Sequence, residues 1–358
     1  MTRTFATGLA LLALAVAGCG DDDGGGGGGA DGGGGDKEAK LAFVYPTTTT
    51  NFAQEMALGA KAAADDTPGV KLTESAPANV DGPKQVQLFQ AAARSSSDGV
   101  AMMTLTPELF IRPLQQAGQD GVPLVAIDVP APAGTEDAVK LLIGNSNVEI
   151  GNDLAKALLP DIPEDAKGEV MIGTDTPGLP VLEQRNQGFM DVMKKERPGL
   201  KFIVFDAKQS PTDNFNTWSA QVKAHPDAIA YVGPGSQAAV SLSRIQKATG
   251  KKLLVGACDL DKVAMQGVKD GLVKALISPE HWLKGYLGIK LMADAKLEGK
   301  ELPEGMWNSG ALEVNKVNID DILARQENAQ SRSDYFKDEV EKQLSDPDQY
   351  LGPMPGGA

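Results

Sequence analysis

The stretch SDGVAMMTLTPELFIRPLQQAGQDGVPLVAID, residues 97–128, contains the pattern that decides the fold. Its apolar run at 99–105 is typical of a buried strand, and Pro107 opens a helical segment that extends to residue 119. A second apolar strand follows at 122–128 and ends in Asp128. Because two continuous apolar strands joined by a helix are typical of a parallel sheet covered on both faces, this stretch predicts an α/β fold.

The same alternation of apolar strands and amphipathic helices extends outward from this stretch in both directions. Two such runs predict two α/β lobes with doubly wound parallel sheets, and such sheets bind ligands beyond the carboxyl ends of their strands. The further strands are expected at 41–46, 70–75, 140–145, 168–174, 201–206, 228–233, 252–258 and 273–278. The further helices are expected at 52–64, 83–94, 149–159, 180–196, 216–224, 236–249, 262–269 and 281–298.

The N-terminus has the pattern of an export signal. Arg3 precedes a short apolar run at 9–17, which is too short to span a bilayer, since that takes roughly 20 residues. The sequence VAGC at 16–19 resembles a bacterial lipobox, so residues 1–18 are expected to be a lipoprotein signal peptide and Cys19 to carry the lipid; the alternative is an ordinary signal peptide with a chance cysteine. Residues 19–39, rich in Gly and Asp, are expected to form a flexible tether.

Composition excludes several classes of function. The chain has 358 residues and a formal net charge of −14, which argues against a nucleic-acid partner because phosphate binding needs clustered Lys and Arg. Two distant histidines and two cysteines give no zinc-ligand cluster, so no metal and no cofactor is expected. We find no G-x-S-x-G elbow, P-loop or Cys–His pair, so the chain is not expected to be an enzyme. Cys258 ends an apolar strand and is expected to be a buried structural thiol.

Four stretches together resemble the type I periplasmic solute-binding proteins of ABC transporters, in their ribose/galactose-binding branch, with the LacI-like periplasmic-binding fold. They are residues 97–128, IGNSNVEIGNDLAKAL at 143–158, EQRNQGF at 183–189, and LLVGACDLDKVAMQGVKDGLVKALISPEHWLKGYLGIKLM at 253–292. The resemblance covers roughly residues 40–320, and unlike the regulators of this fold the chain has no basic helix-turn-helix.

This resemblance implies two lobes joined by three crossover hinges near Asn145, Pro279 and Trp307, which close over a ligand in the cleft between them. The N-terminal lobe is then expected to comprise 40–145 plus 280–307, and the C-terminal lobe 146–279 plus 308–327. Residues 328–358 remain. Within them a helix is expected to pack on the body, with Tyr335, Phe336, Val340 and Leu344 on one stripe and a loose tail after Pro347.

Three charged residues at the ends of strands or in the first turns of a helix are the strongest candidates for ligand binding. Asp128 and Asp259 each follow an apolar strand, where a carboxylate can accept sugar hydroxyls, although both residues could instead cap a turn or helix. Arg185 falls on the Arg of the family's Arg-x-x-Gly-Phe motif, and its guanidinium can bridge adjacent hydroxyls or a carboxylate, although it could also be a surface arginine.

The first loop, TTTTNFAQEM, corresponds to the family's Asn-Pro-Phe-Phe segment. The correspondence places Thr50 at the Asn and Phe52 at the first aromatic, and Asn51 could contribute a side-chain amide. Phe52 could cover the apolar face of a sugar ring, or it could be a core residue.

This sequence departs from the family pattern at several site positions. The usual Asn-Asp pair is replaced by PGS, which makes Ser236 a candidate, and the Arg that often follows the first Asp is Val129. The Gln of the last crossing is replaced within SPEHW, where Trp282 is a candidate although packing is the simpler role. An expected aromatic is missing, with Gln209 nearby. These departures favour a smaller or less polar ligand than a hexopyranose.

The sequence therefore predicts an exported, lipid-anchored solute-binding protein of an ABC importer, which binds a small sugar or polyol by lobe closure. The expected partners are this ligand, the permease and ATPase subunits, and the membrane through the lipid on Cys19, and the chain is expected to be a monomer. The alternative is a sensory receptor of the same fold that presents a signal molecule to a membrane kinase. A hydrolase using Asp128 and Asp259 as paired carboxylates is disfavoured by the resemblance.

Overall fold

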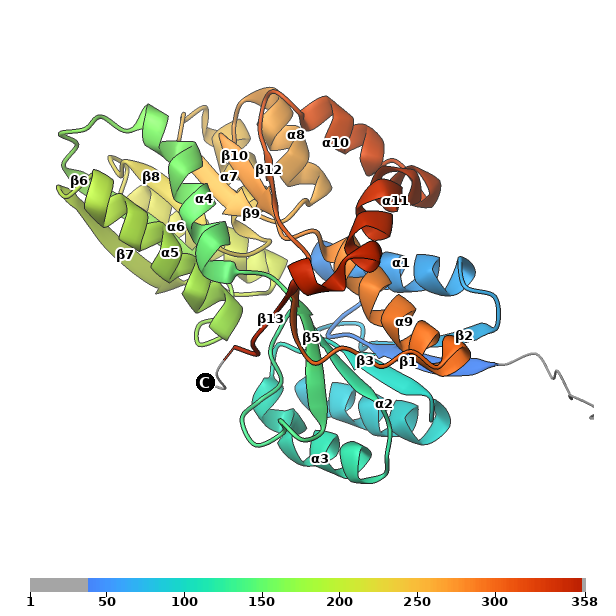
Figure 1. The fold of residues 1–358 in the computed structure, drawn as a ribbon. Coiled ribbons are helices and arrows are strands. Elements are labelled where there is room, and N and C mark those ends of the chain that lie inside the picture. The colour runs from blue at the N-terminus through green and yellow to red at the C-terminus, as the bar shows by residue number, and fades with distance from the viewer. Residues whose placement is uncertain (1–37, 356–358) are drawn as a thin grey trace, which may run out of the picture. The chain divides into compact units, whose positions relative to one another are not determined.

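The computed structural model describes residues 38–355, and within them the chain forms two α/β lobes, each built on one sheet (Figure 1). The predicted fold class is confirmed. Cys19 and most of the expected tether lie outside the described residues.

The N-terminal lobe is built on a sheet with the spatial order β13 (Leu351–Gly352), β11 (Gly305–Asn308), β5 (Val139–Gly144), β4 (Leu124–Ile127), β3 (Gly99–Met102), β1 (Ala39–Val44) and β2 (Val70–Ser75). The sheet of the C-terminal lobe has the order β12 (Leu312–Val314), β10 (Ala275–Ser278), β9 (Val255–Cys258), β8 (Ala230–Gly233), β6 (Gly168–Thr174) and β7 (Leu200–Asp206).

Helices cover both faces of each sheet, as continuous apolar strands require. In the N-terminal lobe, α1 (Asn51–Asp65) and α9 (His281–Glu298) lie on one face, and α2 (Gly82–Ser95) and α3 (Ile111–Gln119) on the other (Figure 1). In the C-terminal lobe, α4 (Asn147–Leu158) and α5 (Pro180–Glu196) share one face. The other face is covered by α6 (Pro211–Ala224), α7 (Ala238–Thr249) and α8 (Lys262–Asp270).

Glycines let the helix pairs that carry site residues approach closely. A Cβ at Gly285 of α9 would collide with the carbonyl oxygen of Met56 in α1, and a Cβ at Gly188 of α5 would collide with that of Val148 in α4. These contacts fix α9 and α5 against their neighbours. Consequently, the side chains that these helices direct toward the strand ends have defined positions.

The chain passes between the two sheets at residues 145–146, 279–280 and 309–311, next to the positions expected for the crossovers. The first and third crossings are joined directly, because the Asn145 amide donates to Ser309 Oγ at 3.1 Å and to the Gly310 carbonyl at 2.6 Å. The second crossing contains Glu280, whose φ of 52° is in the left-handed region that non-glycine residues rarely adopt.

The C-terminal segment is more ordered than its sequence indicates. After β12, α10 (Ile319–Arg325) packs on α8, and α11 (Ala329–Ser345) then packs on α9 and α1 of the other lobe. The expected helix is present, with Phe336 and Val340 buried and Tyr335 exposed. The expectation of a loose tail after Pro347 is wrong, because Leu351–Gly352 pairs antiparallel with β11 and Tyr350 stacks on Trp307.

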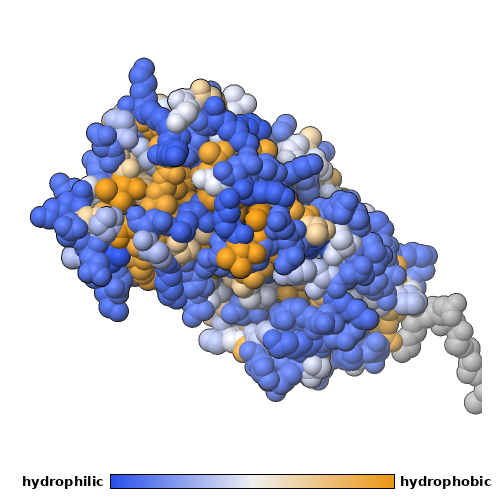
Figure 2. All heavy atoms as spheres, turned by 90° about the horizontal axis from the view of Figure 1, so that it is seen from above, coloured by the Kyte–Doolittle hydropathy of each residue, from blue (hydrophilic) through white to orange (hydrophobic). Residues whose placement is uncertain are grey.

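The face shown in Figure 2 is largely hydrophilic, with hydrophobic side chains in separate patches. Within residues 38–355, no helix is both long and apolar enough to cross a membrane.

Candidate functional site

Three aspartates end strands at the edge where the two sheets face each other. Asp128 follows β4, Asp175 follows β6 and Asp259 follows β9, and all three are almost fully buried. Asp128 and Asp259 have φ angles of 65° and 69°, a conformation that costs free energy for a residue with a Cβ. Such local strain is often kept where a side chain must point into a site.

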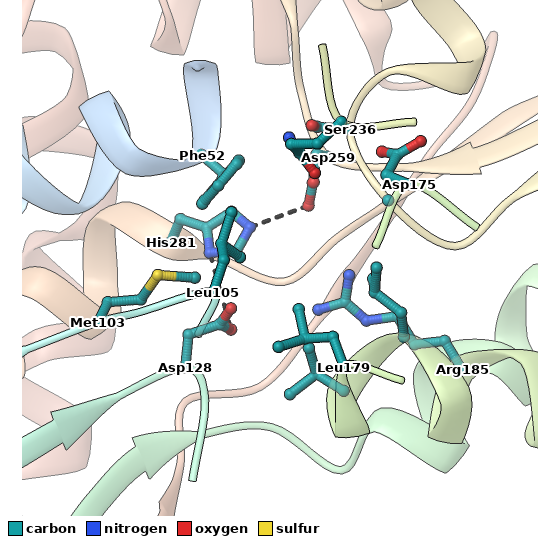
Figure 3. A pocket seen from close by; sticks show the side chains of 14 residues that line it. Phe52, Met103, Leu105, Asp128, Asp175, Leu179, Arg185, Ser236, Asp259 and His281 are labelled. Atoms are coloured by element: carbon teal, nitrogen blue, oxygen red, sulfur yellow. Dashed lines mark hydrogen bonds and ion pairs between the residues drawn. The ribbon is translucent and has the colours of Figure 1, made fainter. Parts of the chain in front are cut away.

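These aspartates line one cavity between the lobes, whose empty space is about 350 Å³ including the part open to solvent (Figure 3). The cavity is lined by Phe52, Met103, Leu105, Asp128, Asp175, Leu179, Val181, Leu182, Arg185, Gln209, Gly235, Ser236, Asp259 and His281.

Asp128 is held as a carboxylate by buried basic groups. Its Oδ1 accepts a short hydrogen bond from Lys284 Nζ and lies 4.0 Å from His281 Nδ1. Burial alone would raise the pKa of the Asp128 carboxyl, but Lys284, then His281 and Arg185, more than offset it and the pKa lies below its usual value. Asp128 is therefore ionised and acts as a hydrogen-bond acceptor.

His281 connects the two lobes across the cavity. It begins α9 in the N-terminal lobe, and its Nε2 lies 2.9 Å from Oδ1 of Asp259 in the C-terminal lobe (Figure 3). Both side chains are buried. This contact has to break if the lobes separate.

Arg185 reaches the cavity from α5, within the sequence motif that predicted it. Its Nε donates to Asn147 Oδ1 at 2.8 Å and its Nη1 to the Pro234 carbonyl at 2.9 Å. The remaining nitrogen, Nη2, is buried and has no hydrogen-bond partner within the described part of the chain. Two bonds thus orient the guanidinium and leave the two N–H groups of Nη2 to donate to a ligand.

Two more buried nitrogens of lining residues have no partner within residues 38–355: Gln209 Nε2 and His281 Nδ1. Thr176 Oγ1 lies 3.2 Å from the other amide atom of Gln209, Oε1, and this contact fixes the orientation of the amide. A buried polar atom without a partner costs free energy, so these atoms mark positions where a ligand or water is expected to bind.

Asp175 has a different electrostatic environment from Asp128. It accepts from Asn214 Nδ2 at 3.0 Å and from the backbone N–H of Gln237 at 3.1 Å, with no Lys or Arg among these hydrogen-bond partners. Burial, helped by the charge of Asp259, raises the pKa of Asp175 to about 7 despite these hydrogen bonds. Its protonation state therefore changes near neutral pH.

One wall of the cavity is apolar and comes from both lobes. Phe52, Met103 and Leu105 of the N-terminal lobe belong to the same buried cluster as Leu179, Val181 and Leu182 of the C-terminal lobe. The cavity therefore offers an apolar surface opposite charged and amide groups, a combination that suits a molecule with one apolar and one hydroxylated side.

The structure brings together six of the nine ligand-binding residues expected from the sequence. Phe52, Asp128, Arg185, Gln209, Ser236 and Asp259 line the cavity.

The other three candidates lie outside this lining. Thr50 is the buried residue that precedes α1, and Asn51 and Trp282 line a smaller cavity behind His281. Trp282 stacks on Phe336 and Tyr286, as a packing residue does. This packing agrees with the simpler role of Trp282, and its contact with a ligand stays a prediction.

Sequence reasoning missed Asp175, His281 and Lys284. A signal existed for Asp175, because it directly follows the strand predicted at 168–174, as Asp128 and Asp259 follow theirs. The apolar wall at residues 179–182 had no comparable signal. Among the described residues, no group of three or more His, Cys, Asp or Glu is arranged to hold a metal ion.

Comparison with known proteins identifies the family. The periplasmic binding protein domain matches residues 41–301 of this chain. The chain belongs to this family. The family implies a location outside the cytoplasm.

Curated relatives of this periplasmic binding protein are named for sugars. The chain is 25% identical over 241 residues to the ribose import binding protein of Bacillus subtilis (strain 168), covering 66% of this chain and 75% of the relative. It is 25% identical over 273 residues to the D-allose-binding periplasmic protein of Escherichia coli (strain K12), covering 74% of this chain and 87% of the relative. These relatives are binding proteins and not enzymes, in agreement with the sequence interpretation.

Solved structures share the fold. A carbohydrate transporter solute-binding protein from Agrobacterium radiobacter in complex with D-arabinose is 26% identical, with a TM-score of 0.70 over 80% of this chain and 97% of that chain. A glucose-galactose binding protein from Geobacillus stearothermophilus, 22% identical, has a TM-score of 0.70 over 79% of this chain and 99% of that chain, and it supports the fold alone.

Proposed function

We propose that this periplasmic binding protein is the extracytoplasmic substrate-binding lipoprotein of an ABC importer, and that it captures a small sugar or polyol between its lobes. The observation that carries the proposal is the position of Asp128, Arg185 and Asp259. They lie on different segments of the chain and line one cavity together with Phe52. The names of the relatives support the class of ligand.

The chemistry of the lining suits a neutral hydroxylated molecule. The carboxylates of Asp128 and Asp259 accept hydrogen bonds from hydroxyl groups, and Arg185 Nη2 and Gln209 Nε2 donate to hydroxyl or ring oxygens. Phe52 and the apolar wall contact C–H groups of the ligand. The few polar groups in the lining favour a pentose, a deoxy sugar or a short polyol over a larger saccharide.

A thermal-shift screen tests this function. Protein lacking residues 1–36 is heated with pentoses, hexoses, polyols and small acids, and a binder at 100 times its Kd should add about 2.7 kcal/mol of stability. Stabilisation by a pentose or polyol is expected. Stabilisation only by molecules without hydroxyl groups would refute the proposal.

Transport and sensing predict different partners for the same closed, liganded form. An importer component should increase uptake of its sugar by the permease and ATPase in reconstituted vesicles, whereas a receptor should alter the activity of a membrane kinase. Uptake assays with and without the binding protein therefore distinguish the proposed function from the sensory alternative.

A further inference from the structure

Lys284 is a fully buried lysine next to the ligand cavity but outside its lining. It lies in the first turn of α9, its side chain has 0% exposure, and its ammonium group donates to Asp128 Oδ1. A buried ammonium group is costly unless it is paired with an opposite charge. Burial lowers the pKa of Lys284, and the charge of Asp128 opposes this effect.

The position of this lysine is fixed by the helix packing. The next residue, Gly285, lies so close to α1 that a Cβ there would collide with the carbonyl oxygen of Met56, so the two helices are tightly packed at this point. On the chain that carries Asp128, the following residue is the buried Val129, which supplies no charge. The cation that neutralises Asp128 thus comes from α9 and not from the loop that faces the ligand.

We propose that Lys284 is a positioning and specificity-determining residue: by occupying Oδ1 of Asp128, it fixes this carboxylate as an ionised acceptor that presents Oδ2 to a ligand hydroxyl. This inference rests on the proposed function, and it adds that the N-terminal lobe recognises a hydroxyl donor and offers no lysine or arginine to the ligand.

Contacts around Asp128 support this assignment. Both the Lys284 and the His281 contacts go to Oδ1, and neither of them uses Oδ2. Because Lys284 does not line the cavity, Arg185 of the other lobe is the one Lys or Arg in the lining. A ligand carboxylate would therefore face the Asp128 carboxylate with no Lys or Arg of the N-terminal lobe in the lining, whereas a hydroxyl would donate to it.

A test of Lys284 has to separate its effect on Asp128 from the effects of the other charged groups around that carboxylate. Lys284 and His281 face it from α9, Arg185 from α5, and Asp259 and Asp175 lie across the cavity after β9 and β6. Replacing Lys284 by Met removes one positive charge and keeps a side chain of similar length. The other groups stay in place.

The decisive measurement is the pKa of the Asp128 carboxyl in purified, ligand-free protein, followed by carbon-detected NMR as a function of pH. In Lys284→Met this pKa should rise by about 1–3 units, the effect of losing an adjacent opposite charge. The matched control is Lys290→Met on the same helix, because Lys290 pairs with Asp294 and not with the site. An Asp128 pKa that is the same in wild type and Lys284→Met would overturn the proposal.

Ligand binding supplies the second measurement, by calorimetry with D-ribose, D-allose and D-arabinose. With whichever sugar binds the wild type, Lys284→Met should lower the affinity about tenfold or more, because Asp128 loses the bond that orients Oδ2 toward the ligand, and Lys290→Met should not. Equal affinities for the two variants would overturn the positioning role. If no hydroxylated compound binds the wild type, the proposed function fails, while the NMR result still decides the link between Lys284 and Asp128.

A double variant covers the case in which Lys284→Met does not fold. Asp128→Asn combined with Lys284→Met removes both charges and should fold, because no unpaired charge remains buried. Folding of the double variant with low sugar affinity supports the counter-ion role. Failure of the double variant to fold would show that Lys284 is needed for packing and not for Asp128.

Discussion

The ring of Phe336 in α11 lies parallel to that of Trp282 in α9, with 4° between the planes and 4.9 Å between the ring centres. Tyr286 stacks on another part of Trp282, with the centres 5.1 Å apart. Trp282 is therefore enclosed by aromatic packing. The C-terminal helix has a structural role, because it covers the indole that the sequence left as a ligand candidate.

Phe336→Ala should destabilise the protein by about 3–5 kcal/mol, the usual cost of removing a buried aromatic ring. The measurement is urea unfolding followed by tryptophan fluorescence. Tyr335→Ala is the matched control, because Tyr335 is 45% exposed and its ring should contribute much less to stability. Sugar affinity should be the same in both variants. If Phe336→Ala alone bound sugar more weakly while fully folded, Trp282 would again be a candidate for ligand binding.

Arg185→Met should lower sugar affinity by about 2–4 kcal/mol, because it removes the donor Nη2 and leaves ligand oxygens unpaired in a buried site. Titration calorimetry measures this change. Arg112→Met, at an exposed position of α3, is the control and should bind as the wild type does. Thr50→Ala should have little effect, since Thr50 lies outside the lining. Wild-type affinity in Arg185→Met would show that the family resemblance does not extend to this residue.

Asp175 should give the stability a characteristic pH dependence. Its pKa is about 7 in the folded protein, against about 3.9 in an unfolded chain, so the folded state binds more protons between these values. Stability contributed by Asp175 is therefore present at pH 4 and is lost as the pH rises to 7, by at most about 1.4 kcal/mol per pH unit.

Asp175→Asn should remove this contribution. The difference in unfolding free energy between wild type and variant should fall from pH 4.5 to 7 and stay constant above pH 7, as measured by urea unfolding. Asp191→Asn, at an exposed position of α5, should show no such trend. A constant difference for Asp175→Asn over the whole range would contradict the raised pKa.

Much of this molecule could be predicted from the sequence because the responsible forces are local. Apolar runs between amphipathic helices specify parallel strands, and the residue directly after such a strand must lie at the ligand-binding edge. Asp128 and Asp259 follow from that rule, and Asp175 satisfies it as well.

Other features depend on contacts between distant segments. Lys284 lies in a helix that is buried over most of its length, and its partner is 156 positions away, so no local pattern marks it as a counter-ion. Similarly, β13 is only two residues long, and pairing with β11 forms it. The partner of Lys284 and the formation of β13 both depend on tertiary packing, which outweighs local propensity.

Cys19→Ser should move the protein from the membrane fraction to the soluble fraction. The prediction rests on the sequence at 16–19, since Cys19 lies outside the described residues. A single lipid chain binds a bilayer reversibly, and stable anchoring takes more than one. Fractionation of cells followed by detection of the protein measures the change, with Cys258→Ser as the control because that thiol is buried. Unchanged membrane retention of Cys19→Ser would exclude lipidation at this residue.

Ligand should close the lobes, and the His281–Asp259 contact gives a way to separate closure from binding. Closure brings the two halves of the apolar wall together, so small-angle scattering should show a smaller radius of gyration when a binding sugar is added. His281→Ala removes the 2.9 Å contact between the lobes, so its ligand-free form should be more open than the wild type. Saturating sugar should still close this variant, with a lower affinity.

Arg185→Met at the same sugar concentration is the control, because a protein that does not bind should give the same curve with and without sugar. Identical curves for the wild type with and without saturating sugar would exclude a hinge motion coupled to binding, and the cavity would then have to admit its ligand without separation of the lobes.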